Sequence, residues 1–321
     1  MNSEKIKISS IRICLQKSSN PRRKKHAQLG LFGTGYMQYF SKKNLRIYKE
    51  IFLYVSIAIC KLEALSIQEF FIPISEEKAN VSGIEEIHQI YVLNLEVRLA
   101  RWFRTKAMLN AFGIEAQRFI GINGWMIPRG KMKNFYKELV ENGQHGGLTP
   151  GQIGCLLSHL SILQHALDKK YQCVWILEDD IVVLRDPKEL GDILKKLHQV
   201  DPEWDLLFTD LHARGNSLEE ILSLETLFGS WCEIIKTQDS FFEPYEDEDF
   251  IRVQYRLCTH SMILSHRGIK KLLDYFQSTK IFLPIDVQMH CCPNKRFYVS
   301  RKEYVTNGKR ETSDTTYRPR S

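Results

Sequence analysis

Residues 172–183 read QCVWILEDDIVV, and this stretch decides the expected fold. Five apolar residues at positions 173–177 precede three consecutive carboxylates, and three more apolar residues follow. An unbroken apolar run with β-branched and aromatic members is typical of a strand buried on both faces of a mostly parallel sheet. Ligands of open α/β sheets bind outside the carboxyl ends of the strands, so the three acids mark a candidate site.

The acids are Glu178, Asp179 and Asp180, and side by side they repel one another. Such a cluster becomes favourable when a hard divalent cation lies between the carboxylates. Mg²⁺ or Mn²⁺ held by one or two carboxylates typically completes its coordination with substrate phosphates. The stretch therefore favours a metal and a phosphate-bearing donor. The alternative is that the acids only end a strand and begin a solvated loop.

Composition places the chain among soluble globular proteins long enough for one large domain or two smaller ones, because 43% of its 321 residues are hydrophobic and 26% charged. The net charge of +7 is unevenly distributed. Residues 1–80 contain 14 Lys and Arg against 6 Asp and Glu, whereas residues 81–321 contain 31 against 32. The balanced second part has no broad cationic excess, which argues against a nucleic-acid-binding protein.

The first 83 residues are expected to form a basic N-terminal extension ahead of a catalytic domain at 84–321. They contain the run PRRKK at 21–25 and a ten-residue apolar stretch at 51–60. Ten residues are too few for a membrane-spanning helix, which needs roughly 20. Three interpretations remain open: a solvated tail, a patch that binds anionic lipid, and a secretory signal read from a start at Met37.

The eight cysteines contain no Cys-x-x-Cys pair, and several lie in apolar runs where a reduced thiol packs as a small hydrophobic group. A reducing compartment is expected. The pair Cys155/His159 and the run 290–292 (HCC) lack the four-ligand spacing of a zinc site and are interpreted as structural.

A β-α-β unit is predicted from residue 84 onward. Its strands are expected at 89–95 and 116–122, and its helix at 97–112 ends at Gly113. Residues 128–147 are rich in Lys, Gly and Asn and predict a long mobile loop of the kind that often covers a site. The helix is expected to bury Leu99, Phe103, Met108 and Phe112 and to expose Arg98, Arg101 and Lys106.

A second helix is predicted to start at Pro150. Thr149 as N-cap, Pro150 at the first helical position and Gln152 three residues after the cap form a capping box. Apolar residues then repeat at three and four, so one face packs on the sheet and leaves Ser158 and His159 beside it.

These motifs together resemble glycosyltransferase family 25, whose bacterial members build lipooligosaccharide and whose animal members galactosylate collagen. The matching segments are spaced over residues 88–315 in the family's order. They are YVLNL at 91–95 with Arg98 and Arg101, LTPGQIGC at 148–155 with SHL at 158–160, ILEDDI at 176–181, SMILSHRG at 261–268 and LPID at 283–286. One departure is THSM at 259–262, where relatives usually have a small residue before a tyrosine.

The resemblance implies a GT-A-like α/β fold, an inverting transfer and a UDP-hexose donor with Mn²⁺ or Mg²⁺. Asp180 is expected to bind the metal directly, Glu178 to act on it through water or to hold the ribose, and Asp179 to contact the sugar. Inversion needs a base opposite the leaving group, and Asp286 is the candidate, with Asp210 in reserve. The donor-binding residues are expected to be Asn94, Arg101, Ser158, His159 and Glu178.

The expected acceptor is a saccharide of a lipooligosaccharide-like glycolipid, with galactose as the expected sugar. The chain ends in YRPRS without the retention tetrapeptide of the collagen-modifying relatives. Reduced cysteines and a basic extension then favour a cytoplasmic enzyme in peripheral contact with an anionic inner membrane face. The alternatives are a collagen-type protein galactosyltransferase, an inactive transferase-like binding module, for which the THSM departure is the motive, and a basic-tailed nucleic-acid or phosphate-binding protein.

Overall fold

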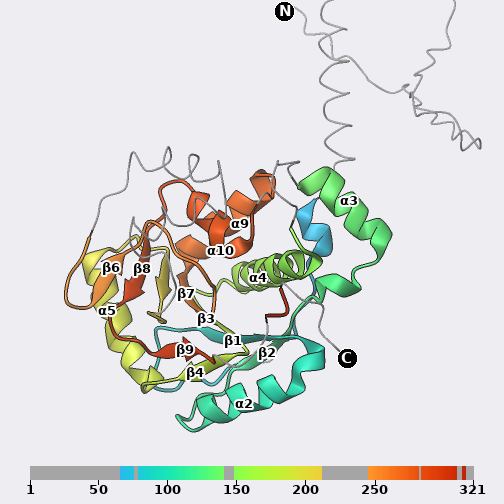
Figure 1. Cartoon of the computed structure of the whole chain (residues 1–321). Helices are drawn as coiled ribbons and strands as arrows, with labels where there is room; N and C mark the ends of the chain where they lie inside the picture. The colour runs from blue at the N-terminus through green and yellow to red at the C-terminus, as the bar shows by residue number, and fades with distance from the viewer. Residues whose placement is uncertain are drawn as a thin grey trace, which may run out of the picture. The chain divides into compact units, whose positions relative to one another are not determined.

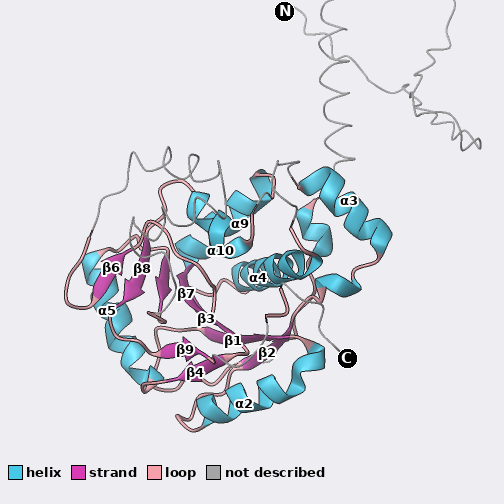
Figure 2. Ribbon diagram, in the orientation of Figure 1, coloured by secondary structure: helices cyan, strands magenta, loops and turns pink. Residues whose placement is uncertain are grey.

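A computed structural model describes residues 66–75, 79–140, 148–211, 245–281, 283–308 and 313–315. The chain divides into two units, Met1–Leu62 and Glu63–Ser321. The first unit, which contains the basic run and the apolar stretch at 51–60, lies outside the described residues. The second unit is an α/β domain with helices on both sides of a central sheet, as Figures 1 and 2 show.

The central sheet of the described residues has the strand order β2-β1-β3-β7-β5-β8-β6. The strands β2, β1, β3, β5 and β8 all point the same way, whereas β7 and β6 run antiparallel to their neighbours. The mostly parallel α/β fold is therefore confirmed. The strands are β1 (Gln89–Asn94), β2 (Gln117–Ile120), β3 (Cys173–Glu178), β5 (Leu206–Phe208), β6 (Phe250–Arg252), β7 (Ser261–Ser265) and β8 (Phe297–Ser300), and a separate ribbon pairs β4 (Ile181–Val183) with β9 (Val305–Asn307).

The core has two layers because alternate residues of each strand face opposite sides of the sheet. In β3, Val174 and Ile176 belong to the layer that contains α4 and α9, and Trp175 and Leu177 belong to the layer that contains α2 and α5. All four of these side chains are fully buried. The helices are α2 (Leu99–Asn110), α3 (Arg129–Leu139), α4 (Pro150–Asp168), α5 (Leu190–Val200), α9 (His266–Ser278) and the short α10 (Ile285–Gln288), with single turns η1 (Ile67–Phe70), η2 (Glu96–Arg98) and η3 (Gly124–Met126) among the connections.

The predicted helix at 150 is confirmed, with Thr149 and Gln152 forming both hydrogen bonds of the capping box. Two glycines let α4 approach the chain that follows β2. A Cβ on Gly124 would lie 1.6 Å from the carbonyl oxygen of Pro150, and one on Gly154 would lie 2.4 Å from that of Ile122. This close packing fixes the N-terminal end of α4 beside the strand ends.

Two expectations about the first half of the domain are wrong. Leu99 and Phe103 of α2 are 48% and 61% exposed, whereas Arg101 is buried together with Trp102. The buried stripe is shifted because Arg101 pairs with acidic groups of the site. Residues 129–139 are not a loop but helix α3, anchored by the buried side chains of Met132 and Phe135; residues 141–147 lie outside the described residues.

The boundary expected at residue 84 also lies earlier in the structure. Ile67 of η1 is 3% exposed in the core layer of α4, and Asn80 pairs with Glu115 as a β-bridge. Residues 66–75 and 79–83 therefore belong to the folded domain, since they bury apolar surface and share backbone hydrogen bonds with it. Within the described residues, no helix has the length and apolar character that crossing a membrane requires.

Candidate functional site

The site lies at the edge of the sheet where β1, β3 and β5 end. The antiparallel strand β7 begins at this same edge, because Ser261 pairs with Leu177 and the amide of Glu178 donates to the carbonyl of His260, 2.9 Å away. Phe208, the last residue of β5, pairs with Met262 of β7. Side chains just beyond three strand ends and just before a fourth strand therefore converge.

The most compact group at this edge is formed by Glu178, Asp180 and His260. One ligand atom from each lies within 4.8 Å of the others. The Oδ1 atom of Asp180 is buried and has no hydrogen-bond partner among the described residues. Two carboxylates and an imidazole suit Mn²⁺, which accepts oxygen and nitrogen ligands. These residues fit a divalent cation, with the unpartnered Asp180 oxygen as one of its ligand atoms.

Burial is the largest influence on the pKa values of this group. Burial raises the pKa of Glu178 and of Asp180 above their usual range, and the neighbouring carboxylates raise them further. Burial by itself lowers the pKa of His260, but the hydrogen bond to Asp210 and the charges of Glu178 and Asp180 outweigh it and raise that pKa to about 9. The group therefore attracts positive charge.

A buried ion pair between Arg256 and Asp210 positions His260. Its Nδ1 atom lies 3.4 Å from Oδ2 of Asp210, and Arg256 donates to the same oxygen at 2.5 Å and to the Asp210 carbonyl at 2.6 Å. Arg256 is fully buried, with its guanidinium 4.3 Å from the centre of the Phe208 ring. Asp210 is 2% exposed and engaged from two sides, so its geometry suits an orienting group better than the reserve base suggested by the sequence.

Asp179 faces the other way, into a network with β1 and α2. Its carboxylate accepts a 2.6 Å hydrogen bond from Asn94 and lies 3.4 Å from Nη1 of Arg101. Burial raises the pKa of Asp179 to about 6 even though both partners favour its charged form. The other side of the Asn94 amide accepts from Arg118. Asn94 therefore positions Asp179 and Arg118 and does not line the pocket.

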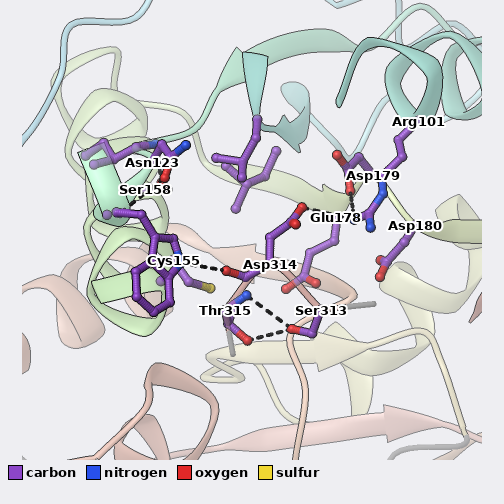
Figure 3. Close-up of a pocket in the computed structure, with 16 residues that line it drawn as sticks. Arg101, Asn123, Cys155, Ser158, Glu178, Asp179, Asp180, Ser313, Asp314 and Thr315 are labelled. Atoms are coloured by element: carbon purple, nitrogen blue, oxygen red, sulfur yellow. Dashed lines mark hydrogen bonds and ion pairs between the residues drawn. The ribbon is translucent and has the colours of Figure 1, made fainter. Parts of the chain in front are cut away.

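A pocket opens beside these groups, with about 630 Å³ of empty space that includes some open solvent. Figure 3 shows Arg101, Asp179 and Asp180 on one side and Asn123, Ser158 and Cys155 on the other. Six parts of the chain line it: the end of β1, Arg101 of α2, the connection at 122–125, the first turns of α4, residues 178–180 and residues 313–315.

Of the two α4 residues expected at the site from the sequence, Ser158 and His159, only Ser158 lines the pocket. Ser158 lines the pocket, where its hydroxyl accepts from the Ile122 amide at 2.8 Å and donates to the Gly154 carbonyl at 2.7 Å. His159 is 1% exposed and is not among the lining residues, and its Nδ1 lies 3.0 Å from the Cys155 carbonyl oxygen. Burial lowers the pKa of His159, so it is a neutral packing residue in this arrangement.

Asp286, the expected base, lies near the acids but outside the set that lines the pocket. Its carboxylate accepts a 3.0 Å hydrogen bond from the Cys258 amide. Burial raises the pKa of Asp286, and Glu178, Cys155 and Cys258 all experience its charge. It is therefore close enough to influence the group electrostatically, and its catalytic role stays a prediction.

Of the site residues expected from the sequence, the structure brings Glu178, Asp179, Asp180, Arg101 and Ser158 together around one pocket, and their roles stay predictions. Sequence reasoning missed His260, Arg256 and the segment 313–315. The available signal for His260 was its place just before the family-like segment at 261–268, but the pairing of β7 with β3 follows from no local pattern. Arg256 and Asp314 stand in stretches without periodicity and carry no such signal.

Comparisons with known proteins agree with this architecture. The model of the family described as "Glycosyltransferase family 25 (LPS biosynthesis protein)" matches residues 87–289, which include the acidic group, His260 and Asp286. The human protein named procollagen galactosyltransferase 2 is 22% identical over 221 residues, covering 67% of this chain and 32% of its own. A Drosophila pseudoobscura protein named glycosyltransferase 25 family member is 24% identical over 250 residues, or 73% of this chain and 35% of its own.

A third relative has a different name. The human protein called inactive glycosyltransferase 25 family member 3 is 28% identical over 216 residues, covering 65% of this chain and 33% of its own length. The chain thus spans about a third of the length of these curated relatives.

Proposed function

The chain belongs to glycosyltransferase family 25, and from this premise we propose that it moves a hexose from a UDP-sugar to a saccharide hydroxyl with inversion at the sugar carbon. The observation that carries the proposal is the convergence of Glu178, Asp180 and His260 within 4.8 Å beside a pocket. A nucleoside diphosphate is a poor leaving group unless its developing charge is neutralised, and this group of ligands is suited to hold the cation that does so.

Each of the three proposed cation ligands has its own structural setting. Thr259 donates a 2.6 Å hydrogen bond to one oxygen of Glu178, which fixes the carboxylate and leaves its second oxygen for a cation. Asp180 supplies the buried oxygen without a partner, and His260 is oriented by Asp210. Bound Mn²⁺ or Mg²⁺ would supply Lewis-acid stabilisation of the diphosphate oxygens.

The remaining residues bind and orient the substrates. Arg101 adds positive charge at the pocket and is held there by Asp179. Asp179 presents a carboxylate to the sugar hydroxyls, with its position fixed by Asn94. Asp286 takes the proton of the acceptor hydroxyl as that oxygen attacks, and its raised pKa brings its proton affinity closer to what a base needs near neutral pH.

For the acceptor we propose a saccharide of a lipooligosaccharide-like glycolipid, with galactose as the sugar transferred. The family description as an LPS biosynthesis protein supports this choice. The positive excess of residues 1–80 suits a cytoplasmic enzyme that meets such an acceptor at an anionic membrane face.

A protein acceptor is the second candidate, because the human relative is named for galactosylation of procollagen. An inactive binding module is the third, because another human relative is named inactive. The grouping of Glu178 and Asp180 with His260 favours an active site over that third candidate.

One experiment separates these candidates. UDP release is measured with a panel of UDP-hexoses and Mn²⁺, in the presence of a lipooligosaccharide-type oligosaccharide or a hydroxylysine peptide, with and without EDTA. We expect metal-dependent release with UDP-galactose and the oligosaccharide. Robust transfer to the peptide alone would establish the protein acceptor, and failure to bind or turn over any UDP-sugar would contradict the proposed function.

A further inference from the structure

The segment Ser313–Thr315 lies inside the pocket, although it stands outside the residues matched by the family model. Figure 3 shows Asp314 between the acidic side of the pocket and the α4 side. Oxygen atoms of the segment accept hydrogen bonds from three different elements. Trp125 of η3 donates to the Asp314 carbonyl at 3.2 Å, Thr149 donates to the Thr315 carbonyl at 2.5 Å, and Arg98 binds the Asp314 carboxylate.

The arginine contacts are those of an anion site. Arg98 donates two hydrogen bonds to the Asp314 carboxylate, from Nε to Oδ2 at 2.9 Å and from Nη2 to Oδ1 at 2.5 Å. Arg101 lies 3.6 Å from Oδ2 on the other side. A planar guanidinium binds carboxylates and phosphates through the same two-pronged geometry. Two arginines that hold a carboxylate here can hold a phosphate instead.

The glycine at the start of α4 is matched to the segment. A Cβ on Gly151 would lie 2.5 Å from the Thr315 carbonyl oxygen and 2.6 Å from that of Asp314, and the third nearest atom, at 2.8 Å, also belongs to Thr315. These are the three nearest atoms that a side chain at this position would meet, and such a contact cannot persist without a shift of one partner. The segment therefore packs directly against the backbone of α4 at Gly151.

The negative charge of Asp314 would repel the diphosphate of the proposed donor. Arg101 is the one cationic side chain among the described residues that line the pocket, which also has Glu178, Asp179, Asp180 and Asp314. A divalent cation offsets two of these acids. Asp314 then remains next to an incoming diphosphate and occupies the arginines that would neutralise it.

We propose that Arg98 and Arg101 form the subsite for the diphosphate of the nucleotide-sugar donor, and that Asp314 fills this subsite until the donor displaces it. This inference rests on the proposed function for the identity of the anion. Residues 313–315 then compete with the donor for the arginine subsite. The apparent affinity for the donor is lowered in proportion to the fraction of molecules in which the segment occupies that subsite.

The first test removes the competing charge in the full chain. Asp314→Asn keeps the shape of the side chain but loses the charge that holds both arginines. We expect its dissociation constant for UDP with Mn²⁺, measured calorimetrically, to fall about tenfold, the gain for a segment seated in roughly 90% of molecules. Asp274→Asn, which removes a surface carboxylate paired with Lys270 on α9, is the matched control and should not change UDP affinity.

A second variant displaces the segment without changing its sequence. Gly151→Ala is expected to push the two carbonyl oxygens away and to tighten UDP binding in the same direction. Arg98→Ala in the Asp314→Asn background should cancel the gain. Unchanged or weaker UDP binding in both Asp314→Asn and Gly151→Ala would overturn the inference, since the segment would then be a supporting wall.

Inorganic pyrophosphate distinguishes failure of this inference from failure of the proposed function. A diphosphate subsite should bind pyrophosphate more tightly in Asp314→Asn than in the natural chain, whether or not the donor is a UDP-sugar. Pyrophosphate gain without UDP binding would keep the anion subsite and contradict the UDP donor. UDP binding by the natural chain without any gain in the variants would contradict only the competitor.

Discussion

Nδ1 of His260 lies 3.4 Å from Oδ2 of Asp210. A carboxylate on one ring nitrogen fixes the orientation of the imidazole and leaves the other nitrogen, Nε2, as a ligand for a cation. Arg256 holds the carboxylate in turn, so two residues, Asp210 and Arg256, support the position of His260. Asp210 is therefore linked through His260 to the group formed by Glu178, Asp180 and His260.

Asp210→Asn should weaken Mn²⁺ binding. The amide cannot stabilise the histidine as the carboxylate does, and loss of such an orienting group typically reduces metal affinity about 10–100-fold. Electron paramagnetic resonance of free Mn²⁺, titrated against the purified variant without donor, measures this directly. Mn²⁺ affinity equal to that of the natural chain would show that Asp210 does not orient His260.

Asp180→Asn should abolish sugar transfer while leaving the fold intact. The residue follows a strand end and supplies an oxygen without a protein partner, so its replacement removes a ligand and little packing. We expect the thermal midpoint to stay within a few degrees of the natural value and UDP release to fall to background. Full turnover by this variant, or by the natural chain in EDTA, is the contrary outcome.

Gly268→Ala should destabilise the domain by about 1–3 kcal/mol. The added Cβ would lie 1.9 Å from the carbonyl oxygen of Asp205, a backbone atom that cannot turn aside. Gly130→Ala, at an exposed position of α3, is the control, because its Cβ meets nothing within 4 Å and alanine favours helix by up to about 1 kcal/mol. Urea unfolding of both variants measures the difference, and equal midpoints would contradict the packing argument.

Two truncated chains test the boundary of the domain. A chain beginning at Ser82 loses the buried Ile67 and the hydrogen bond from Gln117 to Ser75, so its free energy of unfolding should be at least about 2 kcal/mol lower than that of a chain beginning at Glu63. The chain from Glu63 should release UDP at the full rate with a soluble acceptor but fail to sediment with anionic vesicles. Sedimentation equal to that of the full chain would contradict a membrane role for residues 1–62.

Asp201→Asn should change how stability depends on pH. Burial opposes its charged form, but Tyr298, the Glu203 amide and Arg296 donate hydrogen bonds that hold the pKa of Asp201 below its usual range. A lowered folded-state pKa stabilises the fold above the unfolded value of about 3.9, and this contribution is lost as pH falls through the folded value. The stability gap between natural and variant chains should therefore narrow below about pH 4. Asp192→Asn, 86% exposed, should show no such narrowing.

The sequence by itself determined the elements whose cause is local. The apolar run at 173–177 is buried on both faces in β3, the acids follow it at the strand end, and the capping box starts α4 at Pro150. These features depend on neighbouring residues, so strand and helix patterns predict them.

Only the tertiary structure decided which side chains meet. His260 reaches Glu178 because β7 pairs antiparallel with β3, and Arg101 is buried, against the helical pattern of α2, because Asp179 and Asp314 pair with it from distant segments. Hydrophobic periodicity cannot predict a buried charge. A charged side chain is buried only together with an oppositely charged partner, and that partner lies far away along the chain. Neighbouring residues thus indicated where the site lies, while long-range pairing brought His260 and Asp314 to it.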